Sequence, residues 1–177
     1  MDTSTKGWKD TCKKTKIKQI DQDLLNAAYF GNTQNVKKYI KMGGNINYME
    51  DRDGWLGIHY AARWGLTDML LAYIRAGSDV NGKTKNKETS LHKCGRWDTK
   101  RCAIILLEHG ARPDIKNSDG NIASEFTNDP EMKFLLDNYE EYKKIKQNLQ
   151  YREPIKKIES PIRKYIHSKY HNTDYHV

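Results

Sequence analysis

Two histidines, His59 and His92, are the residues best placed to carry acid–base or metal chemistry, since they lie 33 residues apart in a sequence of 177. An imidazole titrates near neutral pH and also binds metal ions, so one interpretation is a catalytic or metal-binding pair. The cysteines, Cys12, Cys94 and Cys102, are odd in number, form no CxxC pair and have no base or metal partner at an informative spacing. The sequence also lacks a glycine-rich phosphate loop, an HExxH motif and a nucleophile elbow. These observations predict a protein that is not an enzyme and holds no cofactor or metal.

A second pattern is better suited to binding than to catalysis. Arg63-Trp64 is repeated as Arg96-Trp97, and Tyr29-Phe30 stands at the matching place one repeat earlier. Arginine beside tryptophan is typical of energetic hot spots in protein–protein interfaces. The alternative interpretation is that these aromatic rings fold over the neighbouring repeat and stiffen the structure.

The elements that must position these residues recur with one period. The segment 58–62 corresponds to 91–95, and the segment 24–28 precedes the first of these by 34 residues. An amphipathic run follows each segment and ends in a glycine, at Gly43, Gly77 and Gly110. The pattern predicts a unit of two short helices, a glycine stop in the left-handed conformation and a hairpin.

This unit resembles the ankyrin repeat, whose signature is Thr-Pro-Leu-His-x-Ala. The best match is residues 89–94, Thr-Ser-Leu-His-Lys-Cys. The resemblance covers about residues 21–142 and implies an all-α solenoid of helix-turn-helix units with short β-hairpin connections. The repeats are expected at about 21–51, 52–84, 85–117 and 118–142. The fourth is degenerate and shortened, with residues 128–131 opening a last helix over Met132–Tyr139.

The resemblance also implies roles for individual residues. His59 and His92 would each bond the backbone of the adjacent hairpin and be structural, and Asp98-Thr99 replaces the Gly-His often found at that turn. Partners of ankyrin repeats usually bind the concave face, formed by the hairpin tips and the outer ends of the first helices. The residues expected there are Tyr29, Phe30, Arg63, Trp64, Arg96 and Trp97 from the helices, and Arg52, Asp53, Trp55, Lys85, Asn86, Glu88, Ser118, Asp119 and Asn121 from the tips.

The expected core consists of small residues in the first helices and aliphatic residues in the second. First helices of neighbouring repeats pack closely, which explains why small residues recur in one register: Ala27, Ala28, Ala61, Ala62, Cys94 and Gly95. Four such units exceed the three that a continuous core needs.

Charge divides the chain into three parts. Residues 1–20 hold six Lys against two Asp, and residues 143–177 hold nine Lys and Arg against three acidic residues, which leaves a net charge of −2 for residues 21–142. The C-terminal arm interleaves its basic residues with isoleucines and with tyrosines that include Tyr151, Tyr165 and Tyr170. Disordered tails are usually poor in such side chains, so this arm is expected to become ordered on the acidic surface of a partner. A merely solubilising tail is the alternative.

Composition bounds the compartment. The net charge is +8, the apolar fraction is 37%, and no apolar run approaches the ~18 residues of a transmembrane helix. Residues 1–20 hold no apolar stretch, which argues against a cleaved secretory signal, and the cysteines favour a reducing compartment. We expect an intracellular protein without a membrane span, cytoplasmic or cytoskeletal, with residence in an organellar complex left open.

The leading functional hypothesis is a non-enzymatic ankyrin-repeat adaptor or scaffold subunit. It would bind one protein on its concave face, while its basic arms anchor it to a larger cytoskeletal or organellar assembly, such as a microtubule. One alternative is association with nucleic acid through the basic, aromatic arms, which could contact phosphates and stack on bases. Another is a soluble inhibitor or effector of a signalling protein, in which the arms would be dispensable.

Overall fold

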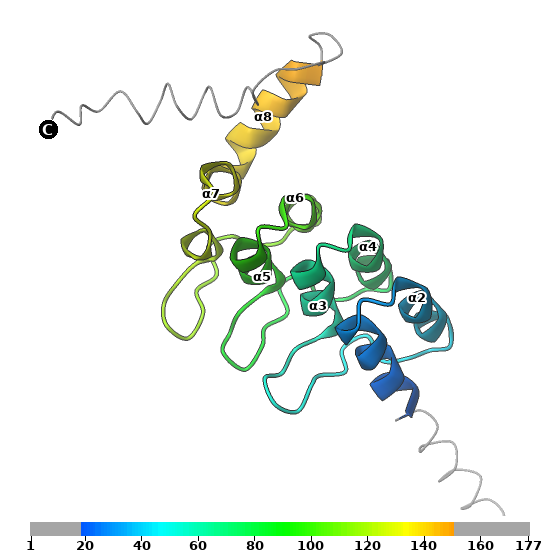
Figure 1. Ribbon diagram of the computed structural model, residues 1–177. Helices are drawn as coiled ribbons and strands as arrows, with labels where there is room; N and C mark the ends of the chain where they lie inside the picture. The colour runs from blue at the N-terminus through cyan, green and yellow to red at the C-terminus, as the bar shows by residue number, and fades with distance from the viewer. Residues whose placement is uncertain (1–18, 151–177) are drawn as a thin grey trace, which may run out of the picture.

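The computed structural model describes residues 19–150, which form a row of paired helices joined by hairpin loops (Figure 1). The first pair is the helical segment 19–29 with α2 (Thr33–Lys41), the second is α3 (Gly57–Trp64) with α4 (Thr67–Arg75), and the third is α5 (Ser90–Trp97) with α6 (Lys100–Glu108). The fourth pairs the 3-10 helix η1 (Ala123–Phe126) with α7 (Pro130–Asp137), and α8 (Tyr139–Gln150) follows. The all-α solenoid predicted from the sequence is confirmed.

The helices lie in two layers. The inner layer holds segment 19–29, α3, α5 and η1, with α5 in contact with both α3 and η1, and the outer layer holds α2, α4, α6 and α7, each in contact with the next. The hairpin loops project from one side of the stack, and α8 extends from its last pair (Figure 1). Within residues 19–150 these loops contain no regular β strand. They are closed by single backbone bonds, such as Glu50 N–H to the Trp55 carbonyl at 2.9 Å and Thr84 N–H to the Glu88 carbonyl at 2.9 Å.

Left-handed residues separate the two helices of each of the first three pairs. Gly31 and Gly65 have φ angles of 71° and 67°, and Asp98 takes the equivalent place in the third pair with a φ of 52°. The replacement of Gly-His by Asp98-Thr99 therefore preserves the turn. The glycines predicted to stop the outer helices, Gly43, Gly77 and Gly110, have φ angles of 85°, 89° and 85°, as a left-handed helix end requires.

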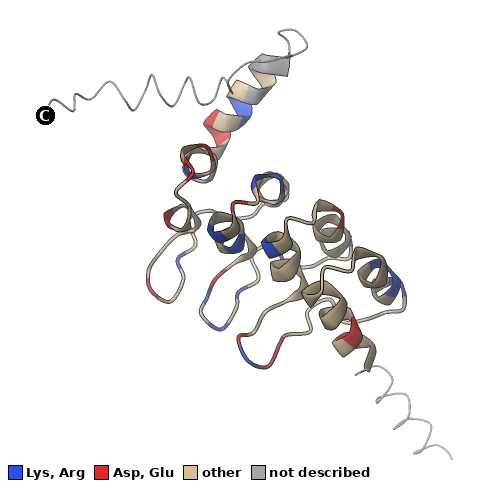
Figure 2. Cartoon of the chain, viewed as in Figure 1, with Lys and Arg blue, Asp and Glu red and all other residues tan. Residues whose placement is uncertain are grey.

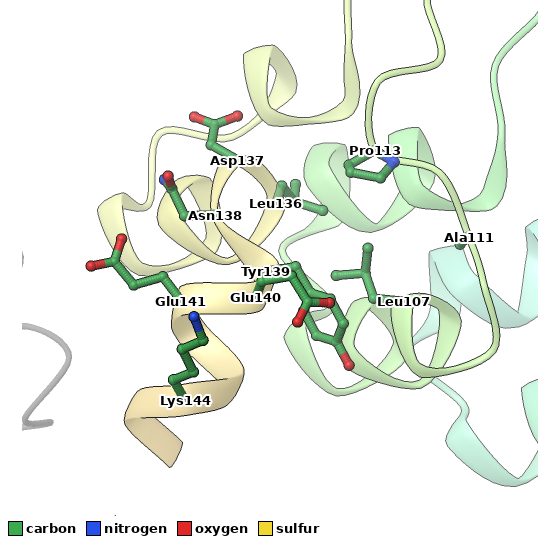
Figure 3. Close-up of a pocket in the computed structure, with 10 residues that line it drawn as sticks. All are labelled: Leu107, Ala111, Pro113, Leu136, Asp137, Asn138, Tyr139, Glu140, Glu141 and Lys144. Atoms are coloured by element: carbon green, nitrogen blue, oxygen red, sulfur yellow. The ribbon is translucent and has the colours of Figure 1, made fainter. Parts of the chain in front are cut away.

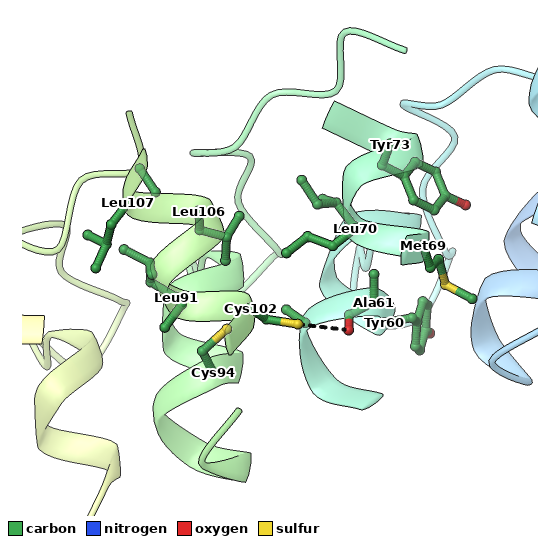
Figure 4. Packing of buried hydrophobic residues seen from close by; sticks show 14 of the residues in the cluster. Tyr60, Ala61, Met69, Leu70, Tyr73, Leu91, Cys94, Cys102, Leu106 and Leu107 are labelled. Atoms are coloured by element: carbon green, nitrogen blue, oxygen red, sulfur yellow. Dashed lines mark hydrogen bonds between the residues drawn. The ribbon is translucent and has the colours of Figure 1, made fainter. Parts of the chain in front are cut away.

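Small side chains allow the inner helices to approach one another. Ala28, Ala61, Ala62 and Cys94 are fully buried. A Cβ on Gly95 would lie 2.2 Å from the Ala123 carbonyl oxygen, so η1 packs directly on the backbone of α5 at this point. The larger core residues come from both layers and include Ile58, Met69, Leu70, Tyr73, Leu91 and Leu106 (Figure 4).

The last unit differs from the prediction in two places. Its second helix runs from Pro130 to Asp137 and not from 132 to 139, because the Asp129 side chain accepts from Glu131 N–H and Pro130 occupies the first helical position. A break at Asn138, where φ is −134°, separates it from α8. Residues 143–150, which the sequence analysis places in the C-terminal arm, are the continuation of α8.

Charges of both signs lie on the hairpin loops, so their projecting ends present no uniform potential (Figure 2). The loop of the second repeat alternates Asp51, Arg52 and Asp53, all exposed. Any selectivity of this surface for charge must therefore come from individual side chains.

Candidate functional site

His59 and His92 each tie the start of an inner helix to the following loop. Leu56 N–H donates to His59 Nδ1 at 2.9 Å, which places the proton on Nε2, and this nitrogen donates to the Gly82 carbonyl at 2.9 Å. His92 repeats the arrangement, accepting from Thr89 N–H at 3.1 Å and donating to the Asn121 carbonyl at 3.1 Å. Burial lowers the pKa of His59 to about 4 and also lowers that of His92. Both imidazoles are neutral near pH 7 with both nitrogens occupied, so neither is placed to act as a base or a metal ligand.

The two described cysteines are packing residues. Cys94 and Cys102 are free and fully buried, and burial raises the pKa of the Cys94 thiol above its ordinary range and that of Cys102 to about 11. The Cys102 sulfur lies 3.9 Å from the Ala61 carbonyl in the preceding repeat (Figure 4). Cys12 lies outside the described residues. Over residues 19–150, no group of three His, Cys, Asp or Glu side chains is placed to hold a metal ion.

The aromatic residues predicted for the concave face lie together at the ends of the inner helices. Tyr29, Phe30, Trp64 and Trp97 remain 48%, 77%, 49% and 38% exposed, although they are large and apolar. With their neighbours they form what we call the concave-face cluster: Tyr29, Phe30, Trp55, Tyr60, Arg63, Trp64, Lys93, Arg96, Trp97 and Phe126.

Ring contacts make this cluster continuous over three repeats. The ring centroid of Tyr29 lies 5.0 Å from Phe30 and 5.4 Å from Tyr60, Tyr60 lies 4.8 Å from Trp55, and Trp55 lies 6.1 Å from Trp97. Tyr60 also donates its hydroxyl to Glu50 Oε2 at 2.9 Å, and burial together with this carboxylate raises its pKa above the ordinary value. The aromatic surface is thus one packed layer with fixed geometry.

An ion-pair network beneath the rings was not anticipated from the sequence. Glu88, predicted to be a hairpin-tip residue, is buried and bonds both Lys93, which is itself buried, and Arg96 Nη2 at 2.6 Å. Burial opposes the charge of Glu88, but the two cations together outweigh it and lower its pKa. Burial also lowers the pKa of Lys93 despite Glu88. The Lys93 ammonium lies 3.8 Å from the centroid of Trp55, which closes the network against the aromatic layer.

Sequence reasoning missed Lys93, Tyr60 and Phe126 for one reason. These three residues occupy one position of successive repeats, 33 residues apart, and the signature leaves that position undefined. A signal was present in their types, because two aromatic residues and a lysine at an otherwise variable place are candidates for a shared surface. Phe126 lies 4.4 Å from the guanidinium carbon of Arg96.

The predicted hairpin-tip residues are divided between solvent and the stack. Arg52 is exposed, whereas Lys85 bonds the preceding loop through its ammonium to the Asp51 carbonyl and through its N–H to the Asp53 carbonyl at 3.0 Å. Ser118 N–H donates to the Asn86 carbonyl at 2.9 Å and links the next pair of loops in the same way. Adjacent loops therefore support one another.

An open cavity of about 470 Å³ lies where the first two repeats meet on this face. Tyr29, Phe30 and Trp55 form part of its wall, and Arg63 also lines it. The remaining lining residues are Gln22, Leu25, Asn26, Glu50, Arg52, Asp53 and Tyr60. A cavity with aromatic walls and both kinds of charge is suited to a peptide side chain.

A second hollow, of about 800 Å³, lies at the end of the stack between α6, the loop after it, α7 and α8 (Figure 3). Leu107, Ala111, Pro113 and Leu136 line it with apolar atoms. Its other lining residues come from the α7–α8 junction and α8: Asp137, Asn138, Tyr139, Glu140, Glu141 and Lys144. None of the residues predicted for binding contributes to it.

Three predicted binding residues, Tyr151, Tyr165 and Tyr170, lie outside the described residues, as does most of the N-terminal arm. In the part of the chain that is described, no helix has the length and apolarity needed to cross a bilayer.

Comparison with known proteins agrees with this architecture. A family model of ankyrin repeats, three copies, matches residues 24–117. The chain is 30% identical over 99 residues to ankyrin repeat-containing protein P1E11.10 of Schizosaccharomyces pombe, covering 56% of this chain and 46% of that protein. It is 33% identical over 86 residues to ankyrin repeat domain-containing protein 37 of Xenopus tropicalis, covering 49% of this chain and 53% of that protein. It is 32% identical over 95 residues to human ankyrin repeat and SOCS box protein 2, covering 53% of this chain and 15% of that protein, so it spans about half or less of these relatives.

Proposed function

This chain belongs to the ankyrin-repeat family, a protein–protein interaction module, and we propose that it is a non-enzymatic adaptor that binds a protein partner through its concave-face cluster. The observation that carries the proposal is the exposure of four large aromatic side chains at repeat-equivalent positions, Tyr29, Phe30, Trp64 and Trp97. Aromatic and arginine side chains at the centre of a patch supply most of the energy in many interfaces. The ring contacts between repeats fix the patch before binding, so little conformational freedom is lost when a partner arrives.

The test compares matched variants of the full chain. Phe30→Ala with Trp97→Ala removes two rings from the cluster, and Met42→Ala with Arg101→Ala changes two exposed residues of the outer layer. Tagged proteins are expressed in their own cells, and associated proteins are quantified by mass spectrometry, with circular dichroism as the check on folding. We expect a partner that is retained by the wild type and the outer-layer variant and lost by the cluster variant. A partner that the folded cluster variant retains in full would contradict the proposal.

Anchoring to a larger assembly is the second part of the proposal. It is supported by the charge of the arms, since nine Lys and Arg in residues 143–177 face only three acidic residues, and a basic segment favours an acidic surface. A cytoskeletal or organellar assembly would present such a surface. The native mass of the full chain in lysate tests it: we expect a large particle that survives moderate salt, and a peak at the monomer mass would contradict it.

The basic, tyrosine-containing arms also favour a second candidate, association with nucleic acid. Phosphate contacts release counterions, so such binding weakens steeply as salt rises. A particle that collapses after nuclease treatment would favour this candidate over a protein assembly. If binding of the protein partner survives deletion of residues 151–177, which leaves α8 intact, the chain acts instead as a soluble inhibitor or effector.

A further inference from the structure

Two repeat-equivalent arginines of the concave-face cluster differ in whether their charge is paired. Arg96 bonds Glu88 at 2.6 Å, whereas Arg63 has no carboxylate oxygen within 4.0 Å among residues 19–150. The cause lies in the sequence, because the residue 33 positions before Glu88 is Trp55. The second repeat therefore presents an arginine whose internal counter-ion has been replaced by an indole.

The three indoles hold this guanidinium in place. The central carbon of Arg63 lies 4.9 Å from the centroid of Trp64, 5.0 Å from Trp97 and 5.8 Å from Trp55. Such contacts attract the cation and restrict its rotamers without occupying its hydrogen-bond donors. The Nε–H is buried and has no acceptor within residues 19–150, although an unmade bond of this kind is costly. Arg63 is thus a positioned donor that lacks an acceptor.

The surroundings of Arg63 define what it can accept. It lines the 470 Å³ cavity with Tyr29, Phe30 and Trp55, whose rings provide an apolar wall beside the charge. Arg52 adds a second cation to the cavity, and Glu50 and Asp53 add two carboxylates. One incoming negative charge is matched by Arg63, whereas a doubly charged phosphate would also be repelled by Glu50 and Asp53.

Building on the proposed function, we infer that this cavity recognises an acidic residue, Asp or Glu, next to an apolar residue in a segment of the protein partner. The carboxylate accepts hydrogen bonds from the Arg63 guanidinium, whose planar fork matches two carboxylate oxygens. The adjacent apolar side chain packs on Tyr29, Phe30 and Trp55. Arg96 takes no part in this recognition because Glu88 already neutralises it.

The test begins with a phage-displayed library of random dodecapeptides selected on the full-length protein. We expect the selected peptides to contain Asp or Glu beside an apolar residue. Replacing that acid by its amide should weaken binding to the wild type on the order of tenfold or more. The same replacement should have no effect on Arg63→Gln, and Arg96→Gln should behave as the wild type does. Circular dichroism checks that each variant folds, and Arg63→Lys tests whether charge alone suffices without the fork.

The outcomes separate this inference from the proposed function. Peptides that lose binding on Phe30→Ala with Trp97→Ala but carry no acidic preference would overturn the inference and leave the proposed function standing. Tighter binding of a phosphoserine version of the peptide than of the acidic one would also overturn it. If no selected peptide depends on the cluster, both the inference and the proposed function fail.

Discussion

The indole N–H of Trp64 donates a hydrogen bond of 2.9 Å to the backbone carbonyl of Tyr29, one repeat earlier. The ring nevertheless remains 49% exposed. The two interpretations of the aromatic positions, interface and stiffening of the stack, therefore apply to different atoms of one side chain. The nitrogen links the first two repeats, and an apolar face remains available to a partner.

Replacing Trp64 by Phe separates these roles, because phenylalanine keeps an aromatic ring and removes the donor. We expect the free energy of unfolding to fall by about 0.5–1.5 kcal/mol, the contribution of one hydrogen bond. Denaturant-induced unfolding of the full chain measures the change. Trp97→Phe is the matched control, since the indole N–H of Trp97 has no hydrogen-bond partner within the described residues. Equal losses in the two variants would show that the bond to Tyr29 contributes nothing.

The buried pair of Glu88 and Lys93 gives a larger effect. Glu88→Gln leaves the Lys93 ammonium buried without a carboxylate, since Lys93 is only 2% exposed. Loss of one member of a buried ion pair typically costs about 3–5 kcal/mol, and we expect a loss of that order in the free energy of unfolding.

The double variant Glu88→Leu with Lys93→Met tests the cause. It removes both charges, and the equivalent positions of the preceding repeat already hold the uncharged Trp55 and Tyr60. We expect it to recover more than half of the stability lost in Glu88→Gln, measured in the same unfolding experiment. A double variant as unstable as the single one would mean that the cost is not that of an unpaired charge.

Stability should fall on mild acidification because of His59. Its pKa is lowered by burial from 6.5 to about 4, so the unfolded chain binds a proton in this window that the folded chain does not. Stability is therefore complete above pH 6.5 and is lost as the pH falls toward 4, by roughly 3 kcal/mol for a shift of this size. Unfolding curves measured at a series of pH values should show this slope.

Two substitutions locate the effect. In His59→Gln the slope between pH 6.5 and 4 should become shallower, although some should remain because the pKa of His92 is lowered as well. His109→Gln, at an exposed position, should leave the slope unchanged. An identical slope in His59→Gln and the wild type would exclude His59 as its source.

The repeat architecture could be predicted from the sequence because each of its determinants is local and periodic. A glycine ends each outer helix, a histidine recurs at the start of the second and third inner helices, and the small residues share one register. The exposed aromatic positions followed from the same register. Their packing into one layer, from Tyr29 through Trp55 to Trp97, depends on side-chain conformations that spacing does not determine.

The Glu88 network shows what spacing cannot reveal. Position 88 is a loop tip by register, but its carboxylate is drawn inward by Lys93 and Arg96, five and eight residues later. The end of α7 was misplaced for a comparable reason. An apolar pattern continues through Tyr139, but the break at Asn138 assigns that residue to the next helix.

Gly95→Ala should destabilise the junction between the third and fourth repeats. In an isolated helix this change would be favourable by about 1 kcal/mol, but here the new Cβ would meet the Ala123 carbonyl oxygen at 2.2 Å. Because the obstacle is backbone, η1 must move, and we expect a net loss of at least about 2 kcal/mol. Hydrogen exchange should show that the loss is concentrated in residues 123–137. Gly77→Ala, which meets no atom within 4 Å and pays only for its φ of 89°, is the control and should lose about 1 kcal/mol without this localisation.

Asp98→Gly should stabilise the protein. Asp98 holds a φ of 52°, a conformation unfavourable for a residue with a Cβ, and Gly65 occupies the equivalent position with a φ of 67°. Burial and the nearby Asp129 also raise the pKa of Asp98, so its charge is disfavoured where it lies. Glycine removes both costs, and we expect a gain of about 0.5–1 kcal/mol in the free energy of unfolding. Lys87→Gly, at a φ of 58° in an exposed loop, isolates the backbone part of the gain. A loss of stability in Asp98→Gly would mean that the aspartate side chain holds the turn before α6, and that the sequence departs from glycine there for a structural reason.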